Sequence, residues 1–224
     1  MMKELELNNS DPEDIEFLLA KVEGSFGIRF HGKELVHVNT FGEMCDHIKN
    51  KIVLDHEDNC TSQQAFYKLR GALMTALQID KETVTPDTLL KDLLPKPIRR
   101  SKTKQIEKNL GFKLSLLRPP HFIMQYLGLL FIGSLIGLGF SWQYALVGLG
   151  LSIAGFWLAV KMGNELDLRT VRELVEKMSR EHYLKSRRNP KTYNKNEIEK
   201  VLIEWFSYDL VIDKSKLTRD ASLT

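Results

Sequence analysis

Residues 122–160 read FIMQYLGLLFIGSLIGLGFSWQYALVGLGLSIAGFWLAV, and this apolar stretch decides the fold. No Asp, Glu, Lys or Arg occurs between His121 and Lys161. A helix needs ~18 or more apolar residues to cross the hydrocarbon core of a membrane, and the stretch holds about two such lengths. We therefore predict a transmembrane hairpin with spans over Phe122–Phe140 and Tyr144–Val160. The competing interpretation is a helix pair buried in a soluble core, but such helices usually carry a polar stripe and neither segment does.

The charges that flank this stretch predict its orientation. Basic residues dominate before the first span and recur after the second, whereas the turn at 141–143 carries no charge. They are Lys96, Arg99, Arg100, Lys102, Lys104, Lys108, Lys113 and Arg118 before it, and Lys161, Arg169, Arg172, Lys185, Arg187 and Arg188 after it. Because cytoplasmic loops are enriched in Lys and Arg, we expect the N- and C-termini in the cytoplasm. The predicted location is the cytoplasmic (inner) membrane of a bacterium, with two spans in contact with membrane lipids.

Small residues follow both spans at the spacing that helix packing uses. Gly133 and Gly137 are an i, i+4 pair in the first span, and Gly148 and Ser152 are such a pair in the second. Helices approach closely where small residues face each other. Two interpretations stay open: the spans pack on one another within the hairpin, or the small residues form the contact of a homo-oligomer. No ionisable group lies in the spans, so transport is not expected.

The rest of the chain offers no catalytic motif. We find no glycine-rich phosphate loop, no nucleophile elbow and no carboxylate pair that the sequence places in one pocket. The loop at 55–60 gathers acids with His56 and Cys60, but adjacent residues do not converge on one ion as i, i+4 ligands do, so no metal site is expected. The basic runs at 96–104 and 185–191 lack interleaved aromatic residues, which argues against nucleic-acid binding. We therefore expect a protein that is not an enzyme and has no catalytic residue.

The N-terminal part carries two helix start signals. Ser10 or Asp11 can cap a helix that has Pro12 in its first turn. Thr40 and Glu43 have the spacing of a capping box, which predicts the start of a second helix.

Two segments that follow, VEGSFGIRF at 22–30 and VNTFGEMCDHI at 38–48, resemble the second half of an acyl carrier protein. The resemblance implies an all-α four-helix bundle that carries acyl groups on a 4′-phosphopantetheine arm, attached to the serine of an Asp-Ser-Leu motif. By the family's spacing, the motif's aspartate falls on Asp11 and its serine on Pro12, which has no hydroxyl. No cofactor is therefore expected, and Ser10 is the alternative attachment site for 4′-phosphopantetheine.

Further segments resemble the same family. Residues 64–90 resemble its first helix and following loop, 106–114 the end of its long helix, and 168–178 its last helix. The resemblance implies a second carrier-like unit that the membrane hairpin interrupts. Residues 197–223 again resemble a first helix and loop, which implies that the N-terminal helices are completed by this segment, by circular permutation or by a swap between two chains.

The predicted fold class is all-α, with acyl-carrier-like four-helix bundles, permuted or interrupted, plus a two-helix transmembrane hairpin. The expected domains are residues 1–60 completed by 193–224, residues 61–120 completed by 164–184, the hairpin at 121–162 and a basic linker at 185–192.

These patterns predict a non-catalytic, membrane-anchored, acyl-carrier-like docking or scaffold protein linked to fatty-acyl or lipid metabolism. The expected protein partner is an enzyme or a genuine carrier of acyl metabolism. Two alternatives stay open. One is a working tethered carrier modified on a non-standard serine, and the other is a structural membrane oligomer.

Overall fold

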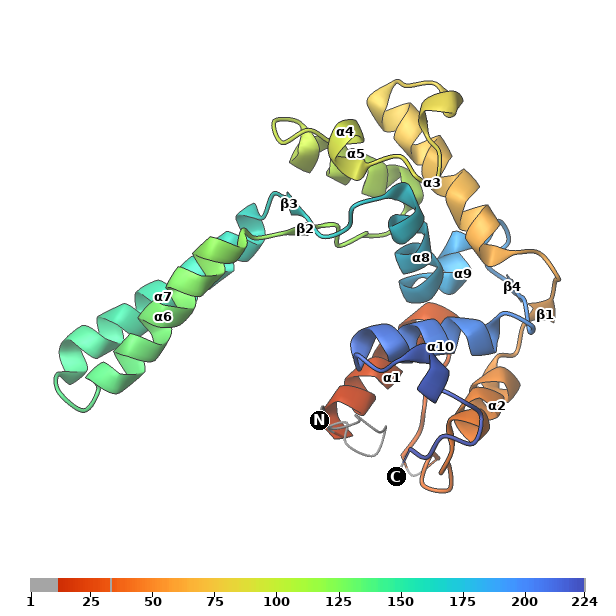
Figure 1. Ribbon diagram of the computed structural model, residues 1–224, viewed down its shortest axis with the longest axis horizontal. Coiled ribbons are helices and arrows are strands. Elements are labelled where there is room, and N and C mark those ends of the chain that lie inside the picture. Colours follow the sequence, from red (N-terminus) through yellow and green to blue (C-terminus); the bar gives the residue numbers. More distant parts are fainter. Residues whose placement is uncertain (1–11, 33, 224) are drawn as a thin grey trace. The chain divides into compact units, whose positions relative to one another are not determined.

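The computed structural model describes residues 12–32 and 34–223 (Figure 1). Helices make up most of these residues, and each described strand is two residues long. The predicted all-α class is therefore confirmed. The chain forms two compact units: unit 1 combines Met1–Gly71 with Arg172–Thr224, and unit 2 is Ala72–Val171.

Unit 1 is built from both ends of the chain. Its elements are α1 (Pro12–Phe26), α2 (Phe41–Lys51), β1 (Asp55–His56), the start of α3 (Thr61–Leu77), nearly all of α8 (Val171–Glu181), α9 (Tyr183–Ser186), β4 (Thr192–Tyr193), α10 (Ile198–Asp209) and the short 3-10 helix η3 (Lys214–Lys216). β1 and β4 pair in parallel, with Asp55 opposite Thr192.

Apolar side chains from α1, α2, α9 and α10 share one core in unit 1. Its members include Leu18, Val22 and Phe26 of α1, Phe41, Cys45 and Ile48 of α2, Tyr183 of α9, and Leu202, Trp205 and Phe206 of α10. The ring centres of Phe26 and Tyr183 are 4.9 Å apart, and those of Phe41 and Phe206 are 5.1 Å apart. Apolar residues three or four positions apart give each helix one face for this core. The C-terminal helix α10 thus packs with the N-terminal helices.

Ser25 ties α8 and α9 to α1. Its Oγ donates to the Arg180 carbonyl at 2.6 Å and accepts from the Tyr183 N–H at 2.8 Å. These bonds satisfy backbone groups at the end of α8, which would otherwise be buried without partners. Residues 172–184 therefore belong to unit 1, whereas their resemblance to the last carrier helix predicts them in the second carrier-like unit.

Local sequence signals set the ends of two helices. The Thr40 Oγ1 accepts from the Glu43 N–H and the Glu43 carboxylate accepts from the Thr40 N–H, both at 3.2 Å, which confirms the predicted capping box at α2. α1 ends at Phe26, and Gly27 follows with a φ of 63°. Glycine adopts this left-handed conformation without the steric cost of a Cβ.

Unit 2 contains the membrane-type segment. After the second half of α3 come η2 (Lys81–Thr83), α4 (Leu90–Leu93), α5 (Arg99–Leu110), β2 (Leu117–Arg118), α6 (His121–Gly137), α7 (Trp142–Met162) and β3 (Glu165–Leu166). α6 and α7 lie side by side and are joined by a short turn (Figure 1). At their base, β2 and β3 pair antiparallel, with Leu117 opposite Leu166.

One loop conformation occurs in both units. Residues 78–90 follow α3 and residues 211–223 follow α10. Each loop begins with a residue of positive φ, Gln78 at 59° and Val211 at 55°, and continues into a 3-10 turn. The segments that follow these residues read IDKETVTPDTLL and IDKSKLTRDASL, so similar sequences give the same local structure.

Each of these loops also ends in the same way. Leu89 forms an antiparallel bridge with Thr170, directly before α8, and Ser222 forms one with Thr40, directly before α2. The two loops therefore dock in the same way on the residue before a helix, which is α8 for the loop at 78–90 and α2 for the loop at 211–223.

Candidate functional site: an exposed apolar helix pair and its base

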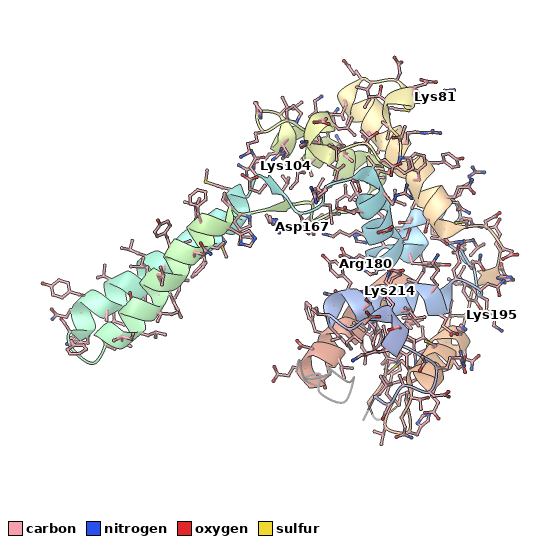
Figure 2. All side chains as sticks on the ribbon, in the orientation of Figure 1. Lys81, Lys104, Asp167, Arg180, Lys195 and Lys214 are labelled. Carbon is pink, nitrogen blue, oxygen red and sulfur yellow. The ribbon has the colours of Figure 1, made fainter. Side chains whose placement is uncertain are left out.

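The outer surface of α6 and α7 is covered with large apolar side chains (Figure 2). The exposed ones are Phe122, Tyr126, Leu129, Leu130, Ile132, Leu135 and Ile136 on α6, Leu138 and Phe140 beyond its end, and Trp142, Tyr144, Leu146, Val147, Leu151, Ile153, Trp157, Leu158, Val160 and Met162 on α7. Soluble monomers rarely expose contiguous apolar patches of more than a few hundred Å². This surface therefore requires an apolar environment that the described chain does not itself supply.

Helix length and burial describe the same surface. Among the described helices, α7, with 21 residues, is the one long and apolar enough to cross a membrane, whereas α6 is apolar but has 17 residues. A core helix of a soluble domain is mostly buried, but only 11% of the most apolar window of α7 is buried. The soluble-core alternative therefore does not describe α7.

The inner faces of α6 and α7 are lined by small residues. Ser134, Ala145 and Ser152 are buried between them, and Ser152 is fully so. A Cβ on Gly148 would lie 2.2 Å from the Ser134 Oγ. The two helices come this close because position 148 has no side chain.

The predicted small-residue positions divide between the two faces. Gly148 and Ser152 lie at the contact between α6 and α7, and a Cβ on Gly137 would be 3.7 Å from that of Ala145. A Cβ on Gly133 would have no described neighbour within 4 Å, so Gly133 does not contribute to the hairpin contact. Ser10, the alternative phosphopantetheine site, lies outside the described residues.

Basic groups meet where the hairpin joins the rest of unit 2. Arg99 is buried and donates from Nη1 to the Asn164 carbonyl at 2.7 Å, and Arg100 donates from Nη2 to the Lys161 carbonyl at 2.8 Å. The Lys161 Nζ lies 4.5 Å from the centre of the Trp157 ring. Cations and aromatic rings at the end of an apolar helix are typical of a membrane–water interface.

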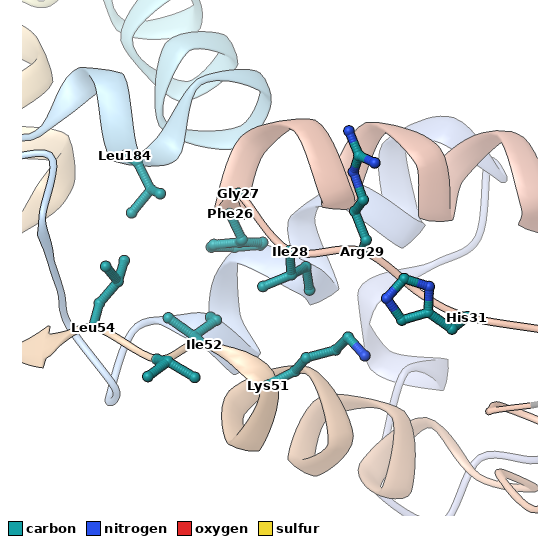
Figure 3. Close-up of a pocket in the computed structure, with 10 residues that line it drawn as sticks. Phe26, Gly27, Ile28, Arg29, His31, Lys51, Ile52, Leu54 and Leu184 are labelled. Carbon is teal, nitrogen blue, oxygen red and sulfur yellow. The ribbon is translucent and has the colours of Figure 1, made fainter.

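A second candidate site is a hollow in unit 1 of about 330 Å³ (Figure 3). One end is apolar, with Phe26, Ile28, Ile52, Leu54 and Leu184, and the other end has Arg29, His31 and Lys51. Pockets for small molecules start at about this volume.

The charge of Lys51 is offset by Glu34. The Lys51 ammonium donates to the Glu34 carboxylate, and the His31 N–H and the His47 ring also bind it, at 2.9 and 3.0 Å. These bonds lower the pKa of Glu34 to about 2, and the bond from Lys51 has the largest effect. Glu34 is therefore ionised at neutral pH and leaves little of the Lys51 charge for a ligand.

Arg187 is a fully buried cation, although it lies in the segment 185–192 that we predict to be a basic linker. It donates to the Thr61 Oγ1 at 2.7 Å, to the carbonyls of Asn59 and Glu57 at 3.1 Å each, and to the Thr192 Oγ1 at 3.3 Å. It thus holds the loop before α3 against β4. One buried arginine within a basic run leaves no periodic signal, so the sequence did not identify it.

No metal or thiol site emerges from the described residues. Within residues 12–32 and 34–223, no three His, Cys, Asp or Glu side chains are placed to hold an ion. Cys45 lies in the unit 1 core, where burial raises the pKa of its thiol to about 12, and Cys60 is an exposed free thiol.

No protein-family model, no curated protein and no solved structure matches the chain.

Proposed function

We propose that the chain is a membrane-anchored helical scaffold whose α6–α7 hairpin crosses the bilayer twice. The observation that carries this proposal is the apolar outer surface of the hairpin, which the described chain leaves uncovered. α7 has the required length. At a rise of about 1.5 Å per residue, the 17 residues of α6 lie at the lower end of the range for a span, and Leu138–Phe140 extend it with apolar residues.

A hairpin places unit 1 and the part of unit 2 outside α6 and α7 on the same side of the membrane. The charge distribution supports the cytoplasm as that side, because the basic residues lie at the base and the turn carries no charge. Arg100, Lys161 and Trp157 then lie at the level of the headgroups.

The soluble units would act by docking. The same loop conformation bridges to the residue before α2 and to the residue before α8, which supports two copies of one helical motif. The proposal that the partner is an enzyme or carrier of fatty-acyl metabolism rests on the resemblance of segments in both units to acyl carrier proteins. The partner would then recognise the surface of unit 1 and not an attached group, since the resemblance puts Pro12 at the position of the family's modified serine.

Cysteine accessibility tests the membrane topology. Gln143 is exposed at the start of α7, and Gln143→Cys in a Cys60→Ser background puts a reactive thiol at the turn. A membrane-impermeant maleimide added to intact cells should label this variant. The native protein, with Cys60 in a soluble unit, is the control and should react only after the membrane is opened. Equal labelling of both proteins in intact cells, or recovery of the chain in the soluble fraction, would overturn the two-span anchor.

Chemical cross-linking in membranes of the native host tests docking. An unrelated two-span protein with the same tag is the control. Enrichment of acyl-metabolism enzymes or carriers over that control supports the proposal, and their absence contradicts it. The intact mass of the purified chain gives an independent result: docking predicts the unmodified mass, and an added phosphopantetheine would mean a working carrier, in which case Ser10→Ala identifies the attachment residue.

A further inference from the structure

We propose that Arg100, Lys104 and Lys108 on α5, here called the α5 basic stripe, bind the headgroups of anionic phospholipids. This inference rests on the proposed membrane hairpin, because it requires α5 to lie near a bilayer. It adds a lipid preference that a hairpin anchor alone does not imply.

The three cations lie on one face of α5. They are spaced at i, i+4 and i+8, so their side chains are neighbours along the helix surface. Lys104, labelled in Figure 2, and Lys108 are exposed, and neither side chain forms a hydrogen bond or an ion pair with the residues that the structure describes. Like charges at this spacing destabilise a helix. The stripe therefore carries repulsion that an external anion would relieve.

The helix itself does not compensate this charge. α5 has no acidic residue in its first turn, and its N-cap residue, Ile98, makes no side-chain cap. The only carboxylate on α5 is that of Glu107, and its Oε1 accepts from the Leu114 N–H at 2.8 Å, beyond the C-terminal end of the helix. The positive end of the helix dipole and the basic first turn add to each other. With five cations against one carboxylate, the net charge of α5 is positive and favours an anion.

The contacts of α5 place its first turn, and with it the Arg100 end of the stripe, at the end of the apolar hairpin. Arg100 donates to the carbonyl of Lys161, in the last turn of α7, and Arg99 donates to the carbonyl of Asn164. The Lys161 ammonium lies over the Trp157 ring at this same end of α7. Cations next to an apolar span meet the phosphates of the adjacent leaflet, and each basic residue near an anionic surface strengthens binding about fivefold.

The occupant we assign is an anionic diacyl lipid rather than free phosphate or an acidic protein. A lipid is held by both its chains and its headgroup. The exposed apolar surface of α6 and α7 belongs to the same unit as the stripe, and Arg100 joins the two through the Lys161 carbonyl. A free anion would use the headgroup interaction alone.

The test measures lipid retention by the full chain. The chain is purified in a neutral detergent and titrated with phosphatidylglycerol, phosphatidylcholine or inorganic phosphate, and bound lipids are counted by native mass spectrometry. The variant is Lys104→Gln/Lys108→Gln. The matched control is Lys195→Gln/Lys200→Gln, which removes the same charge from exposed positions in unit 1. Circular dichroism of both variants verifies that they fold.

We expect the native chain to prefer phosphatidylglycerol over phosphatidylcholine. The Lys104→Gln/Lys108→Gln variant should bind phosphatidylglycerol about 25-fold more weakly, and the control variant should bind it unchanged. The assignment would be overturned if the chain bound both lipids equally, or if both variants lost phosphatidylglycerol binding to the same extent. Equal binding of both lipids is also the result expected if the stripe binds an acidic protein. Competition by inorganic phosphate at low millimolar concentration would show an anion site that does not require a lipid. If cysteine labelling shows that the hairpin is inserted but no lipid preference is found, only this inference fails.

Discussion

Replacing Arg187 by Met should lower the free energy of unfolding of unit 1 by about 3–5 kcal/mol, the usual cost of removing one partner from a buried charged network. The Arg187 side chain is fully buried, and its guanidinium binds one hydroxyl of Thr61, one of Thr192 and two backbone carbonyls. Met fills a similar volume but donates no hydrogen bond. The two carbonyls and two hydroxyls then lose a partner, although the Thr192 hydroxyl keeps the Glu57 carboxylate and the Asn59 carbonyl keeps the Asn194 amide. A group left with no partner costs about 1–3 kcal/mol when it stays dry. The loop before α3 is exposed, so water reaches some of these groups, and the total loss of stability is smaller than the sum of the separate costs.

The assay is urea unfolding of the full chain in mild detergent. Trp205 is fully buried in unit 1, so the change in its fluorescence reports on that unit, whereas the hairpin tryptophans Trp142 and Trp157 stay in the micelle. With a urea dependence of about 1–3 kcal/mol/M, the midpoint should fall by at least ~1 M. Arg188→Met is the control, because Arg188 is exposed, and it should change stability by less than about 0.5 kcal/mol.

Arg187→Lys separates charge from geometry. Lys keeps the positive charge but cannot reproduce the planar fork that reaches several acceptors at once. We expect its midpoint to lie between those of the native chain and Arg187→Met. Equal midpoints for Arg187→Met and Arg188→Met would refute the reasoning, since they would mean that the buried hydrogen bonds add nothing to stability.

Three further results are expected. Gly148→Ala should weaken the contact between α6 and α7 by about 1–3 kcal/mol, because its Cβ meets a serine on α6, whereas Gly150→Ala, with no described neighbour within 4 Å, should not; circular dichroism during SDS titration measures both. Glu34 has a folded pKa of about 2 against its usual 4.5, so its stabilising effect is present above pH 4.5 and disappears as the pH falls towards 2. Glu34→Gln should therefore remove part of the decrease in Tm between pH 4.5 and 2. A Tm profile that does not change in this variant would contradict the assignment. At pH 8 a maleimide should add one label, at Cys60, and a second at Cys45 only after unfolding, as intact mass would show; two labels on the folded chain would contradict the burial of Cys45.

Features that depend on neighbouring residues in the chain were predictable. The capping box of Thr40 and Glu43 and the helical class follow from short-range patterns, and the structure confirms them. The apolar stretch at 122–160 also identified the segment that forms α6 and α7. The two-span topology, the carrier-like character of the units and the docking function stay predictions.

Features that depend on orientation were not predictable. Gly133 and Gly148 look equivalent in sequence, but Gly133 lies in open space and Gly148 lies against Ser134. The rotation of each helix about its axis decides this difference, and that rotation depends on how the whole hairpin packs. The hollow beside Phe26 likewise needs side chains from α1, the segment after α2 and α9 together.

The sequence by itself determined where the helices form and that one segment is apolar all round, because backbone capping and hydrophobic periodicity act over a few residues. Only the tertiary structure decided which side chains of α10 enter the core that α1 and α2 share, and that Arg187 is the one cation of its basic run to be fully buried among the described residues. Both outcomes depend on contacts between residues more than a hundred positions apart. Such contacts form only when the helices have packed, and no local pattern in the chain specifies them.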